Sequence, residues 1–145
     1  MKLEIAPYVG VGPMHFGMDP DHVEAVAGSP FRSKPAAGIR YVYDFGGTLL
    51  FEQSAMGLRL VEMGFRRQCL DLIYRDMNIF RSKREAVLRR ILDEDKGVVE
   101  IVGFLIFPTV GMTLTGFHSG PEEDLALTVF ARGRWDRQIA SARPL

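Results

Sequence analysis

The chain has 145 residues, 47% of them hydrophobic, with 18 basic and 18 acidic side chains. This length favours one domain or two very small ones, and the hydrophobic content is enough for a real core. The balanced charge argues against a nucleic-acid-binding protein that depends on a strong basic field. Cys69 is the only cysteine, so no intramolecular disulfide can form. Residues 1–10 do not have the pattern of a signal peptide. The apolar stretch 98–110 is interrupted by a charged residue, a glycine and a proline, so it is not expected to span a membrane. We therefore expect a cytoplasmic protein without a membrane segment.

The first predicted helix has clear start and stop signals. Asp19 is a typical N-cap, and the proline that follows it suits the first helical position. Val23, Val26 and Ala27 recur with helical spacing and predict one apolar face. Gly28, with a proline two residues later, ends the helix.

An antiparallel meander is predicted to follow this helix. Residues 1–16 read as extended chain, and residues 29–38, with two prolines, predict an exposed loop. Period-two alternation and a Gly-Gly turn then predict strands joined by short turns. The three predicted strands span residues 39–45, 48–52 and 58–65.

The second half has the same predicted order. Ser82 and Glu85 form a capping box for a helix at 82–92, whose arginines, including Arg84, are expected in solvent. Residues 66–78 allow either a short strand or irregular chain. Four further strands are predicted at 98–102, 104–107, 111–117 and 125–132, followed by a tail at 133–145.

These similar halves predict an internal repeat. Residues 47–50 resemble 111–114, and residues 60–65 resemble 125–130, whereas chance similarity between two α+β segments is the alternative. We predict a single α+β domain, 1–145, built as a tandem repeat of one helix packed on an antiparallel β-meander, with sheets that can be continuous. The predicted repeats span residues 10–66 and 79–132.

Residues 15–30, HFGMDPDHVEAVAGSP, resemble the start of the helix in the family around the beta-lactamase inhibitory protein and the small lipoprotein of the outer-membrane barrel-assembly machine. The matching positions are Gly17, Met18, Val23, Gly28 and Pro30. The resemblance implies tandem helix-plus-sheet units and a fold that serves different partners. The second half lacks the Gly-Met and Gly-x-Pro signals, and no lipoprotein cysteine lies near the N-terminus, so the lipoprotein role is not carried over.

A second resemblance lies near the C-terminus. Residues 127–136, LTVFARGRWD, are similar to a V-x-V-F-x-x-G-Y-Y-D motif that ends small bacterial proteins, with Arg134 and Trp135 in place of the two tyrosines. Those proteins look similar to immunity proteins of bacterial toxin systems. The resemblance therefore implies a protein partner, such as a toxin or an enzyme.

The titratable residues do not form a recognisable catalytic or metal-binding motif. His15, His22 and His118 lack the spacing of a zinc site. Two arginines near Cys69 could lower the pKa of its thiol, and a buried, inert thiol is the alternative. Nucleophile, Walker and dinucleotide motifs are not found. We therefore expect no enzyme activity, no metal and no cofactor.

Aromatic and acidic side chains on the predicted strands are candidate partner contacts. Tyrosine and tryptophan are favoured at interface centres, and carboxylates on a concave sheet suit a basic partner. Arg132, Arg134 and Arg137 would instead suit an acidic partner, so the sign of its charge stays open; core packing and a solvated sheet face are the alternatives. The candidate residues are Tyr41, Tyr43, Asp44, Glu52, Glu62, Phe104, Trp135 and Asp136.

Three classes of function are compatible with this sequence. We favour a protein-binding inhibitor, an immunity protein that neutralises a bacterial toxin by occluding it, as a monomer or weak homodimer without nucleic-acid or membrane partners. A small-ligand-binding protein or enzyme would have a pocket near His15, Tyr41 and Tyr43. A structural or assembly module would dimerise through exposed strands.

Overall fold

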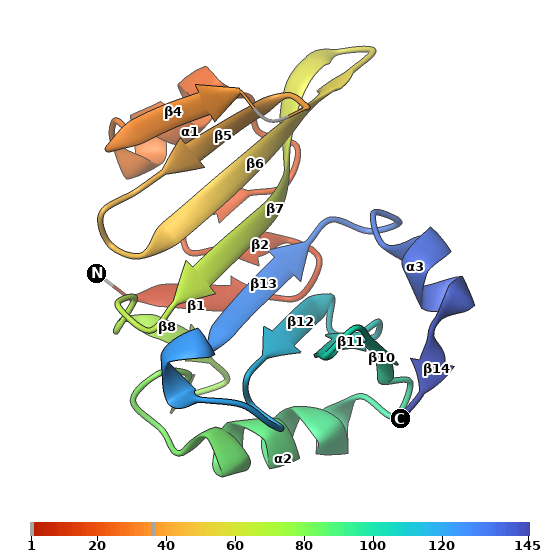
Figure 1. The fold of residues 1–145 in the computed structure, drawn as a ribbon. Coiled ribbons are helices and arrows are strands. Elements are labelled where there is room, and N and C mark those ends of the chain that lie inside the picture. The colour runs from red at the N-terminus through yellow and green to blue at the C-terminus, as the bar shows by residue number, and fades with distance from the viewer. Residues whose placement is uncertain (1, 36) are drawn as a thin grey trace.

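The protein is an α+β protein in the computed structural model, which describes residues 2–35 and 37–145 (Figure 1). The predicted α+β class is confirmed, and the tandem repeat stays a prediction. The helices in the described part of the chain are α1 (Pro20–Ala27), α2 (Arg84–Glu94), α3 (Asp136–Ser141) and the 3-10 turn η1 (Glu122–Asp124).

Most strands lie in one nine-stranded antiparallel sheet. At its centre β7 pairs with β13, which places a meander from the first half of the chain beside one from the second half. The strand order is β14 (Arg143–Pro144), β10 (Val99–Ile101), β11 (Phe104–Phe107), β12 (Met112–Thr115), β13 (Ala126–Phe130), β7 (Gly57–Arg66), β6 (Gly47–Ser54), β5 (Ile39–Val42) and β4 (Arg32–Pro35).

The strands predicted for the two meanders are confirmed, with shifted ends. The predicted exposed loop at 29–38 is wrong for Arg32–Pro35, which form the edge strand β4. All four residues of β4 are exposed, so the segment lacks the apolar alternation that identifies a half-buried strand. Proline and lysine are typical of the outermost strand of a sheet, where they limit unwanted pairing.

A smaller sheet lies behind the large one (Figure 1). Its strands β1 and β8 run parallel, and its other neighbours are antiparallel. The ambiguous segment 66–78 thus supplies two of its strands. The order is β3 (Met14–His15), β2 (Gly10–Val11), β1 (Leu3–Ala6), β8 (Leu72–Tyr74) and β9 (Met77–Asn78).

The main hydrophobic core fills the space behind the large sheet. Leu49, Met63 and Val129 are cross-strand neighbours on β6, β7 and β13, and all three are buried. Val23 of α1 and Ile91 of α2 pack into the same core. Because both helices and the small sheet cover this face, the opposite face of the large sheet remains as the candidate for contacts with other molecules.

The start and end of α1 follow the sequence signals. The Asp19 carboxylate accepts a hydrogen bond from the His22 backbone N–H at 2.8 Å. Gly28 ends the helix with a φ of 85°, a left-handed backbone conformation that favours glycine. Val26, expected on the apolar face, is 38% exposed, so that face is narrower than predicted.

The start of α2 differs from the prediction. Lys83, not Ser82, is the N-cap, and no side chain caps the helix, so the predicted capping box is wrong. Arg84, expected in solvent, donates hydrogen bonds to the backbone oxygens of Gly116 at 2.9 Å and Gly120 at 2.7 Å. These two long-range bonds hold the start of the helix in place of a cap.

Candidate functional site

The second half of the open face of the large sheet is covered by the chain's own C-terminal segment. Ile106 and Phe130 are buried there in a second hydrophobic cluster. Trp135 and Ile139, from the segment that contains α3, pack onto this cluster (Figure 1). We call residues 133–145 the C-terminal strap.

Polar contacts fix the strap to the centre of the sheet. The Arg134 guanidinium lies 2.7 Å from the Glu52 carboxylate and 3.1 Å from the Glu62 carboxylate. The Trp135 indole N–H donates a second hydrogen bond to Glu62 at 2.9 Å. The Trp135 ring meets Phe104 edge to face, with centroids 5.9 Å apart. Four of the candidate partner-binding residues are therefore brought together, but their contacts are within the molecule.

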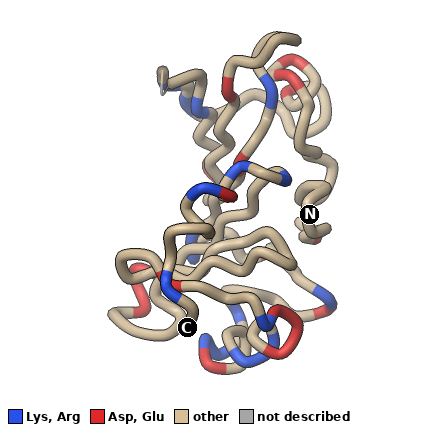
Figure 2. The backbone as a smooth tube through the Cα atoms, turned by 90° about the vertical axis from the view of Figure 1, so that its right-hand side faces the viewer, with Lys and Arg blue, Asp and Glu red and all other residues tan. Residues whose placement is uncertain are grey.

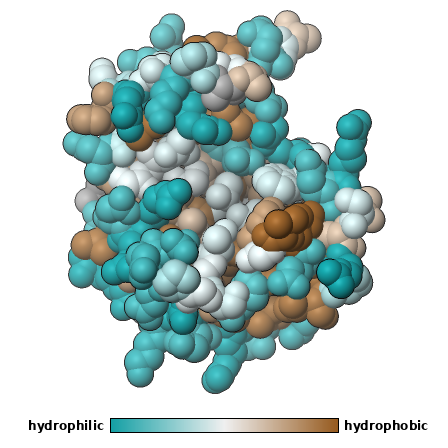
Figure 3. All heavy atoms as spheres, viewed as in Figure 1, coloured by the Kyte–Doolittle hydropathy of each residue, from teal (hydrophilic) through white to brown (hydrophobic). Residues whose placement is uncertain are grey.

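The first half of the open face has no such cover. Thr48, Gly64 and Thr128 are cross-strand neighbours on β6, β7 and β13 and form a floor of small residues. A hollow of about 380 Å³ lies over this floor. Figure 3 shows a pale, weakly polar surface at the centre of this face, between more hydrophilic side chains. We call this hollow the basic groove, for the side chains that surround it.

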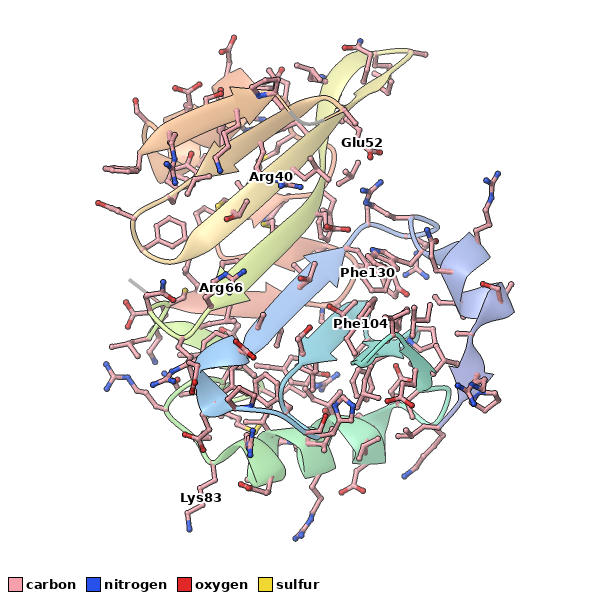
Figure 4. All side chains as sticks on the ribbon, in the orientation of Figure 1. Arg40, Glu52, Arg66, Lys83, Phe104 and Phe130 are labelled. Atoms are coloured by element: carbon pink, nitrogen blue, oxygen red, sulfur yellow. The ribbon has the colours of Figure 1, made fainter. Side chains whose placement is uncertain are left out.

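Among the residues that the structure describes, four basic side chains and no acidic side chain line the groove. Arg32 and Lys34 come from β4, Arg40 from β5 and Arg66 from β7, and all four are exposed. Figure 4 shows Arg40 and Arg66 on the same face of the sheet. Within residues 2–35 and 37–145, none of the four forms an ion pair with a carboxylate.

The arrangement of these charges is unfavourable for the isolated sheet. Lys34 and Arg40 are direct cross-strand neighbours, and like charges in that position destabilise a sheet. Elsewhere Lys and Arg are interspersed with Asp and Glu along the chain (Figure 2), and the net charge is zero. The groove is thus a local positive site on a neutral protein, able to attract an anionic partner.

Gly64 stands at the centre of the groove floor. A Cβ atom at this position would meet only the Thr128 hydroxyl oxygen, at the ordinary contact distance of 3.6 Å. Its backbone is outside the left-handed region, so neither space nor conformation in the folded chain requires glycine here. A glycine inside a strand weakens the strand and often marks a place where another backbone approaches closely.

Tyr41 and Tyr43, two further candidate residues, lie on the covered face. The Tyr41 hydroxyl donates to the Glu24 carboxylate at 2.8 Å, and the Tyr43 hydroxyl donates to the Gly28 backbone oxygen at 2.8 Å. Burial, with the bond to Glu24, raises the pKa of Tyr41 to about 12. Both tyrosines therefore attach α1 to the sheet, while His15 is exposed on β3.

The remaining candidates are scattered. Asp44 is exposed in the turn after β5, and Asp136 is exposed at the start of α3. Cys69 is 2% exposed, and burial raises the pKa of its thiol to about 11, which confirms the buried-thiol alternative. The described residues include no cluster of three histidine, cysteine or carboxylate side chains that could hold a metal ion. Of the helices in the described chain, none is both long and apolar enough to cross a membrane.

The sequence reasoning missed the basic groove because Arg32 and Lys34 lay in a predicted loop. Their i, i+2 spacing was the available signal, since side chains two residues apart share one face of a strand. Pro35 pairs with Ile39 next to the turn between β4 and β5, and this register places Arg40 opposite Lys34. Only the strand pairing across this turn reveals the cluster.

The segment that carries the first resemblance joins α1 to the large sheet. The Gly17 backbone N–H donates to the Leu60 backbone oxygen at 3.0 Å, and Leu60 donates to the Met18 oxygen at 2.8 Å. Val23 is buried in the core, so these positions act in the fold. The suggested family relationship stays a prediction: comparisons with protein-family models, curated proteins and solved structures found no match.

Proposed function

We propose that this protein is a binding protein that docks a partner protein on the basic groove and occludes part of the partner's surface. The observation that carries the proposal is the difference between the two halves of the open face. The chain's own strap covers the apolar half, whereas no described part of the chain covers the half with the four basic side chains, which form no ion pair with a described carboxylate. In its specific form, the proposal is an inhibitor of the immunity-protein type, which the C-terminal resemblance supports.

The shape of the groove suits a macromolecule better than a small ligand. Its lining comes from five neighbouring strands, from β4 at the edge of the sheet to β13 at its centre. Small-molecule sites are typically concave pockets with mostly apolar walls and a few polar groups. Here a floor of small residues is bordered by exposed cations, which favours electrostatic attraction and docking of a complementary surface.

The tandem repeat belongs to the same proposal. Its support is that α1 and α2 both contribute to the core behind the large sheet, each with a meander from its own half. In this interpretation the repeats at 10–66 and 79–132 together build a wide sheet, and the strap restricts docking to the first repeat.

A capture experiment with matched variants tests the function. Gly64→Gln places a neutral side chain on the groove floor, where the space is open apart from Thr128. Lys96→Gln is the control, because Lys96 is exposed and lies on the segment after α2. From a lysate of the source organism, we expect wild type and Lys96→Gln to capture the same protein and Gly64→Gln to lose it. The wild-type protein should also inhibit the captured partner's activity.

The alternatives give different results in the same series. Equal capture by all three proteins would contradict docking on the groove. A homodimer in light scattering that Gly64→Gln converts to a monomer would instead assign the groove to self-association, and the inhibitor proposal would fail.

A further inference from the structure

We infer that the basic groove takes an acidic, extended polypeptide segment of the partner, with carboxylates on the four cations and the main chain passing over Gly64. This inference rests on the proposed function and specifies the partner's chemistry. It resolves the conflict between acidic and basic clues in the sequence in favour of an acidic partner.

The acidic side chains at the centre of the open face already have a cationic partner, which offsets one of their two negative charges. Glu52 and Glu62 are both held by Arg134 of the strap. Because these carboxylates are occupied, they leave Arg40 and Arg66 available for an outside anion. Arginine binds carboxylates through two parallel hydrogen bonds, which gives geometric selectivity as well as attraction.

The spacing of the cations matches a segment with several carboxylates. Arg40 stands in the cross-strand row of Leu50 and Glu62, four residues from Arg66 along β7. With the usual spacings within and between strands, the Cα atoms of Arg40 and Arg66 are about 16 Å apart. About five extended residues cover that distance. A single inorganic anion would contact only part of the cluster, whereas an extended acidic segment can contact all of it.

The groove floor favours a polypeptide over a nucleic acid. Thr48, Gly64 and Thr128 offer no aromatic ring on which a base could stack, and such stacking is a main contribution to single-strand binding on open sheets. Gly64 instead permits close approach of a backbone. Because its net charge is zero, the chain also lacks the general basic field that nucleic-acid binding uses.

Fluorescence anisotropy at low salt tests the inference with defined probes. The probe is a labelled ten-residue peptide of alternating aspartate and glutamate, and the comparison probes are the matched asparagine–glutamine peptide, a uridine decanucleotide and inorganic phosphate as competitor. We expect the acidic peptide to bind and to be released as salt rises. The neutral peptide should not bind, and the oligonucleotide should bind more weakly.

Two charge-matched double variants locate the binding site. Arg40→Ala with Arg66→Ala should weaken acidic-peptide binding about tenfold, the effect expected for losing two partly solvated ion pairs. Lys83→Ala with Lys96→Ala removes the same charge from exposed positions near the two ends of α2 and should change affinity less than about twofold. Figure 4 shows Lys83 far from Arg40 and Arg66. Gly64→Gln should weaken binding without any change in net charge.

The results separate this inference from the proposed function. Equal losses in both double variants, binding of the neutral peptide, or tighter binding of the oligonucleotide would overturn the inference. Displacement of the peptide by millimolar phosphate at constant ionic strength would also overturn it, since one small anion would then suffice. If a partner that Gly64→Gln loses has no acidic segment at the contact, the proposed function stands and the acidic-segment inference fails.

Discussion

Replacement of Arg134 by alanine should loosen the C-terminal strap. The Arg134 side chain is 24% exposed, and its guanidinium bridges two carboxylates on different strands, Glu52 on β6 and Glu62 on β7. Hydrogen bonds to charged groups contribute about 1.5–3 kcal/mol each when shielded, and exposed ion pairs contribute about 0–1 kcal/mol. Because this bridge is partly shielded, we expect a loss of about 2 kcal/mol in the free energy of unfolding.

Urea unfolding and amide hydrogen exchange measure the two consequences. The urea midpoint of Arg134→Ala should lie below that of the wild type. The exchange rate should rise more for the amides of α3 than for those of β7, because the strap opens before the sheet. Arg137→Ala is the control: Arg137 is an exposed residue of α3, and its removal should cost less than about 0.5 kcal/mol. An Arg134→Ala protein with unchanged stability and unchanged exchange in α3 would refute the role given to this bridge.

Three further predictions concern the interior of the protein. Asp95 is fully buried, and its carboxylate accepts hydrogen bonds from the backbone N–H groups of Gly97, Thr109 and Val110. Asp95→Asn should therefore lower the free energy of unfolding by about 3 kcal/mol. The same change at exposed Asp124 should leave it unchanged, and equal stability of the two variants in urea unfolding would contradict this prediction. The pKa of Tyr41 is raised to about 12 in the folded protein against about 10 when unfolded, so the folded state holds the proton more tightly and stability should fall between pH 10 and 12. Tyr41→Phe should reduce that fall in pH-dependent urea unfolding, and an unchanged slope would argue against the bond to Glu24. The buried Cys69 thiol, with its pKa raised to about 11, should react with iodoacetamide at pH 8 far more slowly in the native than in the unfolded protein, and equal rates would show that it is accessible.

The sequence predicted those elements whose ends are determined by residues close to them in the chain. Asp19 and Gly28 mark the ends of α1 because each acts through its own backbone or an adjacent turn. Arg84 could not be placed in this way, because its acceptors at Gly116 and Gly120 are 32 and 36 residues away. Asp95 was missed for the same reason, since two of its three donors lie at Thr109 and Val110.

The candidate site was harder to predict than the fold. Which charges stay unpaired, and which face of the sheet each side chain lies on, depend on how distant segments pair. Glu52 and Glu62 looked like free acidic contacts until the strap brought Arg134 against both. Tyr41 looked like an interface aromatic, but its place in the register puts it beneath α1. Conversely, Lys34 and Arg40 become a cluster only when β4 pairs with β5.

The central claim is that the uncovered half of the open sheet face receives the partner. The most direct measurement is an amide chemical-shift titration of the ¹⁵N-labelled protein with the acidic ten-residue peptide. The account predicts the largest shifts at Arg40, Gly64 and Thr128, with little change in α2 (Arg84–Glu94). Shifts concentrated in α2 or the strap, with the groove amides unmoved, would contradict it.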